Sequence, residues 1–151
     1  LSLHDALPIC VVLSNIFADS LLNIEMFENP FDYKMKITQG NETKERNIDL
    51  IETFNYLIGL NVSSMYSKDG FMLVEGTNRE EENVLVIWRN TKEKSNSDLD
   101  EFLKKRRIST QDFEFKKIYV NGDNNLQNQE EDNVFKVTLI EEEFKKRMFS
   151  I

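Results

Sequence analysis

Five consecutive apolar residues, VLVIW at positions 84–88, interrupt a chain in which 30% of the residues are charged. A strand with solvent on one face alternates apolar and polar side chains, so an unbroken apolar run indicates a strand covered on both faces. Such a strand needs packed layers above and below its sheet. We therefore expect residues 84–88 to form the central strand of a layered α/β fold.

The size and composition of the chain fit one globular domain. It has 151 residues, of which 40% are hydrophobic, and a chain of this length can bury a core without disulfides or metal. Cys10 is the only cysteine, which excludes an internal disulfide and favours the reducing cytoplasm. The apolar stretch 7–13 is much shorter than the roughly 20 residues of a membrane-spanning helix. We expect a soluble cytoplasmic protein that has no membrane partner.

Two helices and a strand are predicted before residue 61. A helix over residues 18–27 has to end before Pro30, because the residue preceding a proline disfavours the helical conformation. Alternating apolar and polar residues predict a half-buried strand over 33–38, followed by a turn at 39–41. Apolar residues at helical spacing predict a helix over 47–60, with Asn47 or Asp49 as its N-cap and Gly59 in the left-handed conformation at its end.

A hairpin and a crossover unit should build the sheet. Asp69-Gly70 lies between two extended runs, residues 62–67 and 71–75, and this dipeptide favours a tight hairpin turn. After residues 84–88 have extended the meander, the sequence from Ser97 predicts a capped helix that runs to about Arg107. Its buried side should carry Leu99, Phe102 and Leu103.

A strand over 117–120 then completes a strand–helix–strand crossover. A further strand over 135–139 and a terminal helix over 140–149, which carries Ile140, Phe144 and Met148, complete the fold. The predicted class is α/β: a mixed sheet, partly an antiparallel meander with one strand–helix–strand crossover, covered by three or four helices.

The charge of the chain argues against general nucleic-acid binding. The formal net charge is -8, from 27 acidic and 19 basic residues, and phosphate neutralisation needs a basic surface. Any DNA contact should therefore be local. Two basic clusters, 104–107 and 145–147, each end a predicted helix, where cations complement the helix dipole. We therefore expect both clusters to lie on solvent-exposed helix ends and favour this interpretation over a contact with phosphate.

The residue types needed for several kinds of chemistry are scarce. The only histidine, His4, lies in a leader that we expect to be non-native, so a Ser or Cys triad would lack its usual base. One histidine and one cysteine, Cys10, are too few for a zinc site. The five glycines never come close enough in sequence for a dinucleotide-binding turn or a phosphate-binding loop. The sequence therefore predicts no catalytic, cofactor-binding or metal-binding residue.

Two segments keep a functional interpretation beside a structural one. The acid-x-lysine triplet within residues 112–116 could hold Mg²⁺ in a small nuclease, although a solvent-facing strand edge is the favoured interpretation. The loop of Asn121, Gly122, Asp123, Asn124 and Asn125 follows a predicted strand, and ligand sites in α/β sheets gather at the carboxyl ends of strands. Turn-forming chemistry explains the same residues and is favoured, but this loop is the candidate functional site.

Four stretches, in order, resemble the C-terminal region of type III restriction-modification DNA methyltransferases. They are NPFDYKMKI at 29–37, DLIETFNYLIGL at 49–60, VLVIWR at 84–89 and IYVNGDNNL at 118–126. The resemblance covers about residues 14–151. It implies a parent enzyme that transfers a methyl group from S-adenosylmethionine to the exocyclic amine of an adenine flipped out of a defined duplex site.

The chain departs from that family where the chemistry occurs. It lacks the D/N-P-P-Y/F/W segment that holds the adenine and the F-x-G-x-G turn that approaches the cofactor. Asn29-Pro30-Phe31 is a near miss that we interpret as a simple turn.

The resemblance thus implies a single C-terminal domain at 14–151 that is inert by itself. We expect residues 1–13 to be a non-native or disordered leader, because LSLHDALPI at 1–9 looks like a translated sequencing-adapter scar. The implied partners are the parent's own N-terminal methyltransferase domain, a second modification subunit, the restriction helicase subunit, and DNA through the parent. The alternative is a free-standing protein-interaction module.

Overall fold

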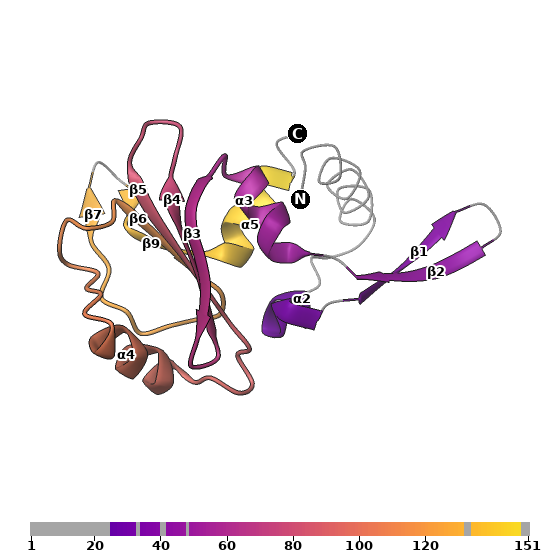
Figure 1. Ribbon diagram of the computed structural model, residues 1–151, viewed down its shortest axis with the longest axis horizontal. Coiled ribbons are helices and arrows are strands. Elements are labelled where there is room, and N and C mark those ends of the chain that lie inside the picture. The colour runs from indigo at the N-terminus through magenta and orange to yellow at the C-terminus, as the bar shows by residue number, and fades with distance from the viewer. Residues whose placement is uncertain (1–24, 33, 40–41, 48, 132–133, 149–151) are drawn as a thin grey trace.

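A mixed five-stranded sheet lies between two helical layers (Figure 1). The computed structural model describes residues 25–32, 34–39, 42–47, 49–131 and 134–148. The strands, in their order across the sheet, are β3 (Asn61–Lys68), β4 (Phe71–Thr77), β5 (Asn83–Arg89), β6 (Lys117–Val120) and β9 (Val137–Leu139). The first three are antiparallel neighbours and the last three are parallel, so the predicted α/β class is confirmed.

Strand β5 is the central strand, as its apolar run predicts. Its side chains are buried from Val84 to Arg89 and alternate between two cores. Trp88 faces the layer formed by α2 (Glu25–Glu28), α3 (Leu50–Leu57) and α5 (Ile140–Met148). Ile87 faces α4 (Asn96–Lys105) on the opposite side of the sheet.

The hairpin between β3 and β4 is also confirmed. Lys68 pairs with Phe71, which leaves Asp69 and Gly70 as a two-residue turn. Both have positive φ, 53° and 85°, the combination that suits the twist of antiparallel strands.

Helix α3 is shorter than predicted. Asp49 is its N-cap and accepts a hydrogen bond from the Glu52 amide at 3.0 Å, while Gly59 has a φ of 66° beyond its end. Asn47, the other candidate cap, is instead the last residue of strand β2 (Glu42–Asn47), which pairs with β1 (Lys34–Gln39). The charged sequence of β2 has no strand pattern, and pairing with β1 overrides its local preference.

Helix α4 begins two residues earlier than expected. Its N-cap is Ser95, not Ser97: the Ser95 hydroxyl accepts from the Asp98 amide at 3.2 Å, and the Asp98 carboxylate accepts from the Ser95 amide at 2.9 Å. An acid lies three residues after either serine, so the sequence alone does not separate the two caps. The predicted buried stripe of Leu99, Phe102 and Leu103 is confirmed.

The C-terminal strand is split. β8 (Val134–Phe135) pairs with β7 (Glu130–Glu131), whereas β9 pairs with β6 after a break at Lys136. The Lys136 amide donates to Gln129 O at 2.8 Å, next to the β7–β8 pairs, whereas Lys136 O accepts from the Ile118 amide of β6 at 2.8 Å, so the chain changes its pairing partner at this residue. In α5 the predicted apolar residues Ile140, Phe144 and Met148 are buried, and residue 149 lies outside the described residues.

The N-terminal helix ends before Pro30, as predicted, and a 3-10 turn, η1 (Pro30–Asp32), follows α2. The rest of that predicted helix, residues 18–24, and the predicted leader 1–13 lie outside the described residues, as do positions 33, 40 and 41 of the predicted strand and turn. Within the described ranges, no helix has both the length and the apolar character needed to cross a membrane.

Candidate functional site

The carboxyl ends of the three parallel strands bring together side chains from distant parts of the chain. Arg89 ends β5, Asn121 follows β6, and Glu141 lies in the first turn of α5, just after β9. Hydrogen bonds join Arg89 to Asn121, and Glu141 to the next residue, Gly122. We call Arg89, Asn121, Gly122 and Glu141 the carboxyl-end cluster.

Asn121 is fully buried and uses both ends of its amide. Its Nδ2 donates to Phe27 O and Arg89 O, each at 2.8 Å, and its Oδ1 accepts from the Arg89 amide at 2.9 Å. The side chain thus satisfies backbone groups at the end of β5 and of α2 that would otherwise be buried without partners. Through these hydrogen bonds, the Asn121 side chain connects helix α2 to the end of strand β5.

Arg89 is only 2% exposed, which is unusual for a permanently charged side chain. Its guanidinium donates to three carbonyl oxygens: Asn121 O at 3.2 Å, Lys94 O at 3.3 Å and Asp123 O at 3.2 Å. Burial lowers the pKa of Arg89, while the negative charges of Glu141 and Asp100 oppose the shift. The guanidinium thereby holds the β5–α4 loop and the loop after β6 together.

Glu141 joins the same loop to α5. Its two carboxylate oxygens accept from the Gly122 amide at 3.1 and 3.0 Å. Burial raises the pKa of Glu141, and the hydrogen bonds from Gly122 partly offset that shift. Gly122 has a φ of 81°, and a Cβ there would lie 2.8 Å from Thr91 Cγ2, so this position requires glycine.

The predicted candidate loop divides into a buried and an exposed part. Asn121 and Gly122 belong to the carboxyl-end cluster. Asp123 and Asn125 are exposed, and Asp123 contributes its carbonyl to Arg89. Asn124 folds back on its own loop, since its Nδ2 donates to Gly122 O at 3.3 Å and its Oδ1 accepts from the Leu126 amide at 3.2 Å.

Sequence reasoning alone does not single out Arg89 or Glu141. An arginine that ends a fully apolar run, and a glutamate that directly follows a short strand, are the signals that point to them. Neither signal is specific in a chain with 30% charged residues.

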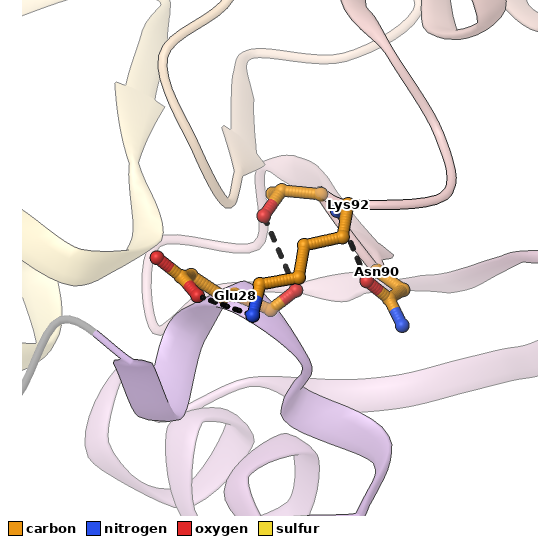
Figure 2. Close-up of polar contacts among 4 residues, drawn as sticks. Glu28, Asn90 and Lys92 are labelled. Carbon is orange, nitrogen blue, oxygen red and sulfur yellow. Dashed lines mark hydrogen bonds and ion pairs between the residues drawn. The ribbon is translucent and has the colours of Figure 1, made fainter.

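A second set of contacts fixes the loop beside this cluster to α2 (Figure 2). The Thr91 amide and hydroxyl both donate to Glu28 O, at 2.8 and 3.2 Å. Lys92 Nζ lies 3.4 Å from a carboxylate oxygen of Glu28, and the Lys92 amide donates to Asn90 Oδ1 at 3.0 Å. A pocket of about 340 Å³ opens next to this loop and includes Arg89, Lys94 and Asp123 in its lining.

A larger groove of about 920 Å³ lies at the other end of β6. Two lysines in it are held by carbonyl oxygens, Lys117 Nζ by Phe135 O and Lys136 Nζ by Asp112 O, each at 2.5 Å. Burial lowers the pKa of Lys117, opposed by the charge of Glu143. Burial also raises the pKa of Tyr119 to about 12, so its hydroxyl stays neutral at physiological pH.

The acid-x-lysine triplet borders this groove. The prediction that it lies on a strand edge is wrong. Residues 112–116 form a loop, and β6 begins only at Lys117. The Asp112 carboxylate accepts from the Glu114 amide at 3.1 Å, a local turn contact that keeps the chain from extending. Phe113 is fully exposed and Phe115 is buried. Among the described residues, no group of three histidine, cysteine, aspartate or glutamate side chains could hold a metal ion.

No family model matches the chain, and neither does any curated protein or solved structure. The internal geometry and the resemblance of the four stretches are therefore the grounds for a functional proposal.

Proposed function

We propose that this chain is the C-terminal α/β domain of a type III restriction-modification DNA adenine methyltransferase. Its role is structural: it packs on the catalytic domain and supports assembly, and by itself it transfers no methyl group. The observation that carries the proposal is where the resembling stretches fall in the fold. The stretches 84–89 and 118–126 form β5, β6 and the following loop, and they supply Arg89 and Asn121 to the carboxyl-end cluster.

The hydrogen bonding of that cluster supports a structural role. The Asn121 amide and the Glu141 carboxylate both bond to groups inside the domain, and the Arg89 guanidinium does the same. Groups that are used in this way fix the orientation of helices and loops more readily than they bind a substrate.

The proposal implies a division of labour in the whole enzyme. S-adenosylmethionine and the flipped adenine would bind to the N-terminal methyltransferase domain, and this domain would need no cofactor of its own. Its partners would be that catalytic domain, a second modification subunit and the restriction helicase subunit. DNA would be reached through the parent enzyme, in the cytoplasm.

Calorimetry on the purified chain tests the proposal. Titration with S-adenosylmethionine should give no binding isotherm, and incubation with duplex DNA and the cofactor should leave the adenines unmethylated. Addition of the parent's N-terminal domain should restore methylation. A clear isotherm with this chain alone would contradict the proposal.

The gene upstream separates this proposal from the alternative, a free-standing protein-interaction module. An open reading frame that encodes both missing motifs in phase with Ser14 supports the methyltransferase. A start codon just before Ser14 supports the independent module.

A further inference from the structure

Lys136 is the most unusual side chain in the groove at the start of β6. It is only 9% exposed, and its ammonium has one acceptor among the described residues, Asp112 O at 2.5 Å. An ammonium carries three N–H donors, and a neutral carbonyl oxygen does not balance its charge. Burial of such a charge is costly unless an anion pairs with it. Lys136 therefore lacks the anionic partner that its burial requires.

Lys117 is a second lysine of the same kind in this groove. Its Nζ donates to Phe135 O, the carbonyl that directly precedes Lys136, at 2.5 Å. The negative charge of Glu143 acts on Lys117, but the Glu143 carboxylate is already paired with Arg147 Nε at 2.8 Å. Among the described residues, neither lysine forms an ion pair with a carboxylate. The groove thus contains two ammonium groups that are held by neutral oxygens.

The lining of the groove is a basic region of an acidic chain. Among its described residues, basic side chains outnumber acidic ones by five to four, although the whole chain has a net charge of -8. The basic residues are Lys116, Lys117, Lys136, Lys146 and Arg147, and the acidic ones are Glu82, Asp112, Glu130 and Glu143. Two of these acids also accept hydrogen bonds from nearby groups, Glu82 from Asn78 Nδ2 and Asp112 from the Glu114 amide. The charges of the groove therefore complement an anion.

Aromatic rings line the same groove. Phe113 and Phe135 are two of the three exposed phenylalanines among the described residues, and both lie in this lining together with Tyr119. Apolar rings with a few polar groups at fixed positions are the usual lining of a small-molecule site. The volume of about 920 Å³ also lies within the range of such sites. The groove can therefore take up a ring as well as an anionic group.

We propose that this groove binds a small aromatic acid, in which a flat ring carries a carboxylate, a phosphate or a sulfonate. The anionic group accepts hydrogen bonds from the ammonium groups of Lys117 and Lys136, which retain donors that their carbonyl partners do not use. The ring packs against Phe135, whose backbone joins these two lysines. The ligand thus supplies the missing negative charge and covers an exposed apolar ring.

The two ends of β6 differ in what they offer a ligand. Ligand sites in α/β sheets usually lie at the carboxyl ends of the strands. There, the polar groups of Arg89, Asn121 and Glu141 bond to groups inside the domain. At the amino end, two ammonium groups keep unused donors. This inference goes beyond the methyltransferase proposal, which gives the domain no ligand, so the failure of one does not decide the other.

Fluorescence titration with 1-anilinonaphthalene-8-sulfonate tests the proposal, because this probe joins an anionic group to flat rings and reports apolar surroundings. The folded natural chain should bind it saturably. N-phenyl-1-naphthylamine has the same rings without the sulfonate and should bind about tenfold more weakly, since it cannot accept charge-assisted hydrogen bonds. Equal binding of the two probes, or no binding of the sulfonate, would overturn the proposal.

Two lysine variants locate the site. Lys136→Gln removes the charge but retains a donor for Asp112 O, so the fold should be kept while sulfonate binding weakens about tenfold. Lys117→Gln should have the same effect. Lys104→Gln is the matched control, because Lys104 is an exposed lysine at the end of α4, and it should leave binding unchanged. Thermal unfolding checks that each variant is folded. Folded Lys136→Gln or Lys117→Gln variants that bind the probe as tightly as the control contradict the site.

Displacement of the bound sulfonate identifies the anionic group of the ligand. Naphthalene-1-carboxylate and 1-naphthyl phosphate share one ring system, so the stronger competitor shows whether the groove prefers a carboxylic acid or a phosphate ester. Displacement by either one supports the proposal. Displacement by neither, or equally strong displacement by the neutral 1-naphthol, contradicts it.

Discussion

Asn121 makes three buried hydrogen bonds with one side chain, so its loss should cost more than that of any exposed loop residue. Asn121→Ala would leave the Arg89 amide and the carbonyls of Phe27 and Arg89 without these partners. We expect a loss of about 3 kcal/mol in the free energy of unfolding, measured by urea denaturation. Asn125→Ala, in the exposed part of the same loop, is the control and should change stability by less than about 0.5 kcal/mol. Equal losses of stability in the two variants would show that the hydrogen bonds of Asn121 do not stabilise the fold.

Glu141 should give the fold a distinctive pH dependence. Burial raises its pKa in the folded state above the ordinary value of 4.5, so the folded state binds this proton more tightly than the unfolded state does. Stability therefore falls as the pH rises from 4.5 through the raised pKa. Glu141→Gln retains an oxygen that can accept from Gly122 but cannot ionise, so its unfolding free energy should lack this decline. Parallel pH profiles for the two proteins, measured by urea denaturation, would contradict the assignment.

At the scale of elements, the cap of α4 offers two serines that the sequence does not separate. Ser95→Ala removes the acceptor of the Asp98 amide and should lower the free energy of unfolding by about 1 kcal/mol. Ser97→Ala changes an exposed residue in the first turn of the helix, where alanine is at least as favourable as serine, so stability should stay the same or rise slightly. Thermal unfolding of both variants decides the matter, and a larger loss from Ser97→Ala would reverse the assigned cap.

The elements that the sequence predicts correctly are those whose signal is local. β5 follows from its unbroken apolar run, and the β3–β4 turn from Asp69-Gly70. Strand β2 and the split at Lys136 depend on pairing with other segments, so no local pattern predicts them. The residues of the site divide in the same way into those with a local sequence signal and those without. Turn chemistry points to Asn121 and Gly122. Their partners have no such signal, since Arg89 lies 32 residues from Asn121 and Glu141 lies 19 residues from Gly122. Only the meeting of parallel strand ends brings these partners together.

For the whole molecule, we expect the five-stranded sheet and the two-stranded β1–β2 sheet to differ in their stability against local unfolding. β5 is buried between two helical layers, so its amides should exchange with solvent only through global unfolding. β1 and β2 form a two-stranded sheet of their own that extends away from the five-stranded sheet (Figure 1), and such hairpins are marginal alone. Hydrogen exchange followed by mass spectrometry should therefore show much faster exchange in β1 and β2. Asn121→Ala should accelerate exchange in β5 and leave the hairpin unchanged, whereas equal acceleration in both would mean that they unfold as one unit.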